Sequence, residues 1–146
     1  MSDMTDSTKR RLDRVEALRE ATRFARTLGH RTGLDWSPTW ETHLTSHAPE
    51  ADWTWGAVLR FGTGRLTVLR LGDAYEWRVE LLETGVTYEP EIGPFPRDPV
   101  VAAAEGLRDA ARMVQKWRDV IRDADVIAAD LDAMIEHASN GVRDEN

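Results

Sequence analysis

The sequence contains no cysteine. Without thiols the chain can form neither a disulfide nor a thiolate zinc site. It also lacks any run of 18 consecutive apolar residues, and its first residues are polar and charged. These absences predict a soluble, cytoplasmic protein with no membrane-spanning helix and no signal peptide.

Motifs that carry chemistry are equally scarce. No G-x-S-x-G elbow surrounds a serine, and Gly62-Thr63-Gly64 leads toward an expected strand, whereas a phosphate-binding loop would lead into a helix. His43 and His47 are four residues apart, which on a helix would allow two metal ligands, but Glu41 precedes the first histidine and so does not complete an HExxH motif. We therefore expect no catalytic residues, no metal site and no cofactor, and a protein that is not an enzyme.

A length of 146 residues fits one domain spanning 1–146, with residues 1–6 and 140–146 expected to be flexible. Apolar residues at helical spacing predict a first helix from about Asp6 to Leu28, with Gly29 suited to the cap at its end. Ser37 and Pro38 resemble the start of a second, short helix, which would end before Pro49.

Alternation of apolar and polar residues then predicts three strands, over residues 53–61, 65–71 and 75–81, and a short edge strand over 86–89. Gly62-Thr63-Gly64 and Gly72-Asp73 supply the tight turns between consecutive strands. Tryptophans 53, 55 and 77 fall on the expected inner face, where they would form part of the core.

The last third of the chain carries the strongest pattern. From Val100 onward, every seventh residue and the residue three positions after it are apolar. These twelve residues form one seam: Val100, Ala103, Leu107, Ala110, Val114, Trp117, Ile121, Ala124, Ala128, Leu131, Ile135 and Ala138. Asp98 and Pro99 suit the start of a helix, no glycine or proline occurs from Leu107 to Asn140, and Gly141 is placed to end it. Either one long helix extends over 98–138, or the chain breaks near residues 122–125 and folds back as a hairpin.

The expected fold class is therefore α+β. An N-terminal helix and a short helix precede an antiparallel meander of three to four strands, and a long C-terminal helix or helix pair packs on one face of the sheet. A continuous helix would overhang a single domain of this size. The exposed half of the seam would then carry self-association as a homodimer, through Val114, Trp117, Ile121, Ala128, Leu131 and Ile135.

The net charge of −7 is distributed unevenly. Residues 9–34 carry eight bases and three acids, a net charge of +5, whereas residues 98–146 carry eleven acids and six bases, a net charge of −5. A basic first helix and an acidic last helix are matched to lie side by side, within one chain or between two.

The acids of the last helix avoid the seam and form a strip at Asp119, Asp123, Asp125, Asp130, Asp132 and Glu136. Such a strip suits a non-enzymatic interaction protein, an acidic adaptor or inhibitor that docks on a basic protein partner. One form of this function is a phage or mobile-element inhibitor that blocks a host system as a charge mimic. Trp36 and Trp40 are additional candidate contact residues, because tryptophan is enriched at binding hot spots.

Two alternatives concern other ligands. Trp36, Trp40 and His43 could surround an aromatic cleft for a small molecule, and less favourably a small enzyme could use such a cleft. In the order of its elements the chain resembles the double-stranded RNA-binding domain. That family carries lysines where this last helix begins with Asp98, Glu105 and Asp109, so direct nucleic-acid binding is not expected.

Overall fold

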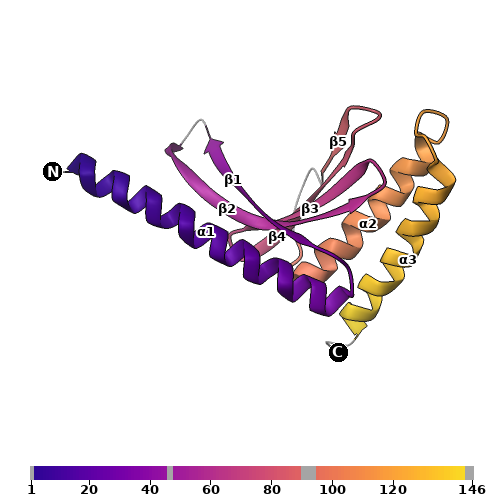
Figure 1. Cartoon of the computed structure of the whole chain (residues 1–146), viewed down its shortest axis with the longest axis horizontal. Coiled ribbons are helices and arrows are strands. Elements are labelled where there is room, and N and C mark those ends of the chain that lie inside the picture. Colours follow the sequence, from indigo (N-terminus) through magenta and orange to yellow (C-terminus); the bar gives the residue numbers. More distant parts are fainter. Residues whose placement is uncertain (1, 46–47, 90–94, 144–146) are drawn as a thin grey trace.

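The computed structural model describes the backbone of residues 2–45, 48–89 and 95–143, and within helices and strands the side chains of residues 15–40, 55–89 and 95–142. These residues form three helices and a five-stranded antiparallel sheet with strand order β1-β2-β3-β4-β5. Figure 1 shows α1 (Ser2–Thr32) crossing below the sheet, and α2 (Pro99–Lys116) and α3 (Ala124–Arg143) paired at the end of the molecule opposite the N-terminus. No helix in the described part of the chain has the length and apolar character needed to cross a membrane.

Helix α1 (Ser2–Thr32) is longer at both ends than the expected helix over residues 6–28. The glycine that ends it is Gly33, with a φ of 71°, and not Gly29, because the amide of Gly33 still bonds to the Gly29 carbonyl at 2.9 Å. The Thr32 hydroxyl closes this end: it donates to the Leu28 carbonyl at 2.6 Å and accepts from the indole of Trp36 at 2.9 Å. Trp36 is thereby fixed in the core, with 7% of its surface exposed.

The predicted short helix after Trp36 is wrong, because residues 37–45 form strand β1 (Ser37–Thr45). Its register places Trp40 opposite Trp55 of β2 (Ala48–Phe61). A proline is compatible with the first residues of an edge strand, and the threonines and tryptophan that follow Pro38 favour extended backbone. The Ser-Pro signal was outweighed by this strand propensity, and the sheet gains a fifth strand.

The other strands confirm the antiparallel meander. They are β3 (Gly64–Leu71), β4 (Ala74–Leu81) and the short β5 (Val86–Tyr88), each paired with its neighbour in the chain. Alternate residues of β2, β3 and β4 form one buried face, whose members include Ala57, Leu59, Leu66, Val68, Trp77 and Val79.

Helices α1 and α2 lie on this buried face, and α3 packs against α2 on the same side of the sheet. From α1, the ring of Phe24 stacks on Tyr75 at 5.3 Å and meets Trp55 edge-on at 5.2 Å between centroids. From α2 (Pro99–Lys116), Gly106 lies so close to β3 that an added Cβ would be 2.4 Å from Leu66 Cδ1. The expected α+β arrangement, with helices packed on one face of the antiparallel sheet, is thus confirmed.

The opposite face of the sheet carries charged side chains. Arg65 of β3 donates to Glu80 of β4 at 2.8 Å, and Arg78 lies 3.3 Å from the other oxygen of the same carboxylate. The hydrogen bond from Arg65 lowers the pKa of Glu80; burial opposes it, and the positive charges of Arg65 and Arg78 add to the lowering. On this face the Arg65–Glu80 pair thus links neighbouring strands, and the Arg78–Glu80 pair lies within β4.

The C-terminal third is a helical hairpin of α2 and α3 (Ala124–Arg143). The prediction of one continuous helix is therefore wrong, and the alternative prediction of a hairpin is confirmed. The Asp98 carboxylate caps α2 by accepting from the Val100 amide at 2.9 Å, as its sequence predicts. Gly141 does not end α3 but lies within it. Its missing Cβ lets the helix approach α1, since an added Cβ would lie 2.1 Å from the Arg31 carbonyl oxygen.

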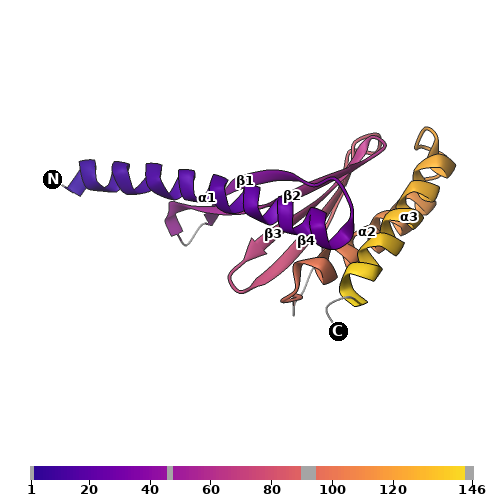
Figure 2. The same cartoon turned by 60° about the horizontal axis from the view of Figure 1, so that its bottom comes forward.

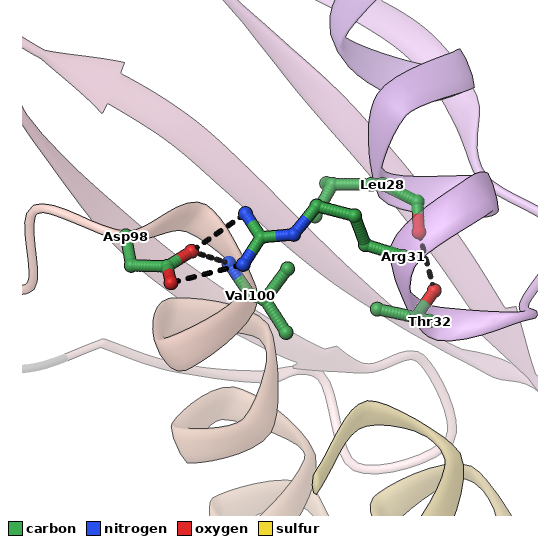
Figure 3. A network of polar contacts seen from close by, with 5 residues as sticks. All are labelled: Leu28, Arg31, Thr32, Asp98 and Val100. Atoms are coloured by element: carbon green, nitrogen blue, oxygen red, sulfur yellow. Dashed lines mark hydrogen bonds and ion pairs between the residues drawn. The ribbon is translucent and has the colours of Figure 1, made fainter. Parts of the chain in front are cut away.

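One ion pair fastens α1 to the start of α2. Arg31 donates from Nη1 and Nη2 to the two oxygens of Asp98, at 2.9 and 3.0 Å (Figure 3). Burial acts to raise the pKa of Asp98, but the hydrogen bonds from Arg31 and Val100 and the charge of Arg31 outweigh it and lower the pKa. The same carboxylate therefore caps one helix and binds the end of another.

Candidate protein-interaction surface

The turn between α2 and α3 consists of residues 117–123. The amides of Val120 and Ile121 both bond to the Trp117 carbonyl, at 2.9 and 3.0 Å. Asp123 adopts a φ of 58°, which aspartate tolerates better than most residues. The amide of Arg122 donates to the Glu83 carboxylate at 2.8 Å, which ties the turn to the loop between β4 and β5. The position of α3 is therefore fixed at its start as well as along its length.

The seam of apolar residues faces inward within a single chain. Val114 and Leu131 are 1% and 0% exposed, and Ile121 in the turn is 6% exposed. The other residues expected to carry self-association, Trp117, Ala128 and Ile135, are half-buried and pack against the same core. Because the fold already covers most of the seam, a dimer contact through it would be limited to these three residues, and self-association by this route stays a prediction.

The outer side of α3 defines the acidic face, a term used here for Asp125, Val126, Ala129, Asp130, Asp132, Ala133 and Glu136. All seven residues are exposed. Val126, Ala129 and Ala133 follow one another at three- and four-residue spacing and therefore form one apolar stripe. Asp130 lies on one side of this stripe, and Asp125, Asp132 and Glu136 lie on the other. The sequence anticipated the acids but not the apolar stripe between them.

Large exposed apolar side chains occur at the start of α3 and in the turn before it. Val126 is 62% exposed, and Val120 in the preceding turn is 55% exposed, beside Asp119 and Asp123. Apolar groups inside a charged rim are the usual composition of a protein-binding surface. The arrangement offers contact area as well as charge.

Few cations in the described part of the chain neutralise these acids. Arg118 binds Asp125 at 3.0 Å, with both side chains largely exposed. Among the described side chains of α1, Arg31 pairs with another helix, and its partner is Asp98, the cap of α2. Helices α1 and α3 meet near their C-terminal ends, at Gly141, and diverge from there (Figure 1). Within one chain, the basic and acidic helices are thus not laid side by side.

The remaining candidate residues occupy other parts of the fold. Trp36 is a core residue, Trp40 is half-buried on β1, and neither belongs to the acidic face. His47 and the side chain of His43 lie outside the described residues. The backbone of residue 43 is in a strand, so the helical spacing assumed for a metal pair does not apply there. Among the described side chains no group of three or more metal-ligating residues converges.

The structure shows a hollow that sequence reasoning missed. An open depression of about 450 Å³ is lined by Trp77 of β4 and by Glu105, Arg108 and Arg112 of α2. Arg112 binds Asp109 at 2.9 Å, and Arg108 approaches the Ser139 hydroxyl at 3.5 Å. Two guanidinium groups four residues apart have the charge and the donors to bind an anion, and that spacing was the available sequence signal. Both are already engaged by neighbouring side chains.

Comparisons with known proteins add no assignment: no protein-family model matches the chain, and searches of curated proteins and of solved structures return no match.

Proposed function

We propose that the protein acts by binding, with the acidic face of α3 docking on a positively charged surface of a partner protein. The observation that carries this proposal is the outer side of α3, where an exposed apolar stripe lies between acids of which only Asp125 has a described cation partner. Over residues 119–136, six acids against one arginine give a net charge of −5.

The physical basis is that charged and apolar groups contribute differently to protein binding. Opposite charges accelerate encounter and fix orientation, and apolar area at the centre of the contact supplies most of the affinity. The acidic face offers both on one rigid element, because α3 is packed on α2 and fixed at its start by Glu83. A partner of matching chemistry would present an apolar ridge flanked by arginines or lysines.

An inhibitory role is the specific form of this proposal. A protein that binds nucleic acid carries a positive surface for the phosphate backbone. An acidic helix that occupies this surface would exclude the nucleic acid, as expected for an inhibitor encoded by a phage or mobile element.

The experiment starts with capture of partners from the native host on the immobilised chain and identification by mass spectrometry. The deciding measurement uses the purified partner. We expect its affinity to fall as salt concentration rises, and to fall at least tenfold in the triple variant Asp130→Asn, Asp132→Asn, Glu136→Gln, which removes three acids of the acidic face.

The matched control removes three exposed acids elsewhere, in the variant Asp35→Asn, Asp73→Asn, Glu89→Gln. Both variants change the net charge equally, so a difference between them reports the position of the charges. Binding that is indifferent to salt, or that is weakened equally by the two variants, would contradict the proposal.

A further inference from the structure

The described part of α1 carries a surface that complements the acidic face. Val15 and Leu18 are 45% and 41% exposed, although both belong to the apolar pattern of this helix. Thr22 continues the same edge at four-residue spacing, and the exposed Arg19 and Arg26 lie together along one side of it. We call Val15, Leu18, Arg19, Thr22 and Arg26 the basic edge.

The side chains of the two surfaces are complementary in size as well as in charge. The basic edge presents the larger aliphatic side chains of Val15 and Leu18, whereas the acidic face presents the small Ala129 and Ala133 beside Val126. Small residues on one helix leave room for large ones on its neighbour, which is how two helices pack closely. Neither Arg19 nor Arg26 forms an ion pair with a described residue of its own chain, so both are available to the acids that flank the stripe.

From this match we infer that a second copy of the chain is a partner of the acidic face, bound through its basic edge. The inference rests on the proposed function, because it fills the same face. Pairing of α1 with α1 would oppose arginines to arginines, and pairing of α3 with α3 would oppose acids to acids. The combination of α1 with α3 of the second copy satisfies both charge patterns.

The shape of the molecule allows this contact to occur twice in one dimer. Helix α1 extends inward from one end of the long axis, with the basic edge in its middle and C-terminal part, and α3 lies at the other end (Figures 1 and 2). Two chains lying antiparallel would therefore place each basic edge on the acidic face of the other, with two-fold symmetry. Such a dimer closes on itself, and its two equal contacts double the buried area relative to a single helix pair.

The test uses two charge-reversed variants of the full-length chain, examined by light scattering coupled to gel filtration. The acidic variant is Arg19→Glu, Arg26→Glu, and the basic variant is Asp130→Arg, Glu136→Arg. We expect the wild-type chain to have twice the monomer mass of 16.5 kDa and each variant alone to have the monomer mass. Mixed in equal amounts, the two variants should regain the dimer mass, because each then meets the opposite charge on both contacts.

The matched control is Arg60→Glu, Arg97→Glu, which reverses two exposed arginines elsewhere and should leave the dimer intact. All substituted positions are exposed, and circular dichroism with a melting curve verifies that each variant is folded. A wild-type chain that is monomeric at its highest soluble concentration overturns the inference. A dimer that persists in both variants also overturns it and indicates another contact, such as the outer edge of β1.

These failures can be told apart from failure of the proposed function. If the chain is monomeric but its binding to a purified basic partner is still lost in the triple variant described above, the acidic face binds a partner other than its own copy. If both experiments fail, the acidic face has no docking role.

Discussion

Replacement of Asp98 tests the contact that joins the first helix to the C-terminal hairpin. Asp98→Ala removes two interactions: the hydrogen bond from the Val100 amide that caps α2, and the bidentate ion pair with Arg31. Loss of an N-cap costs about 1 kcal/mol. A hydrogen bond to a charged group contributes about 1.5–3 kcal/mol. The lower end applies here, because the Arg31 and Asp98 side chains are 20% and 32% exposed.

The expected loss is therefore about 2–3 kcal/mol in the free energy of unfolding, which for a chain of this size lowers Tm by roughly 5–10 °C. Asp98→Asn separates the two contributions. Asparagine caps helices about as well as aspartate but cannot offer two anionic oxygens to Arg31. We expect the asparagine variant to lose only the ion-pair share, about 1–2 kcal/mol.

The assay is urea unfolding at pH 7 followed by circular dichroism. Asp73→Ala is the control, since Asp73 pairs with Arg97 at 3.8 Å but both side chains are more than 80% exposed. A change within about 0.5 kcal/mol is expected there. If Asp98→Ala were no worse than this control, the contact would not stabilise the fold. Equal losses in the alanine and asparagine variants would show that the cap contributes nothing.

Two further predictions concern pH and the contact between α1 and α3. Asp98 and Glu80 both have pKa values lowered below their ordinary 3.8 and 4.5, so their stabilisation is fully present above these values and is lost as the pH falls through the lower folded-state values. Urea unfolding from pH 7 to pH 3 should thus show stability falling below about pH 4.5, and a smaller difference between wild type and Asp98→Asn at the acidic end; a constant difference would contradict the role of Asp98. Gly141→Ala should destabilise by about 1–3 kcal/mol, although alanine favours helix, because its Cβ would meet the Arg31 carbonyl. The neighbouring exposed Asn140→Ala should be neutral or stabilising, and a Gly141→Ala variant that melts no lower than wild type would refute the close contact.

The sequence predicted the parts of this fold whose local and tertiary preferences agree. The period-two alternation of residues 75–81 required a half-buried strand, and Asp98-Pro99 required a helix start; both are found. Residues 37–45 were misassigned because Ser-Pro serves equally well before a helix and at the start of an edge strand. The pairing of Trp40 with Trp55, which decides between them, is a long-range contact that the local sequence does not contain.

The break between α2 and α3 was ambiguous for a different reason. The turn, residues 117–123, is seven residues long, which equals one repeat of the apolar pattern. The spacing of the apolar residues is therefore the same before and after the turn. Trp117 and Ile121 continue the pattern while they form the turn and not a helix. The acids of the candidate surface were visible in the sequence, but the apolar stripe of Val126, Ala129 and Ala133 required knowledge of which side of α3 is covered. The basic edge likewise depended on the exposure of Val15 and Leu18 in the folded chain.

The length of that turn has a consequence for how the topology is encoded. If Trp117 to Asp123 were excised, the apolar repeat of the two flanking helices would continue in phase across the junction, so their periodicity alone does not encode the reversal. The reversal of the chain, and with it the choice between a closed hairpin and an extended rod, is therefore specified by these few residues and by the glutamate of the neighbouring loop that holds them.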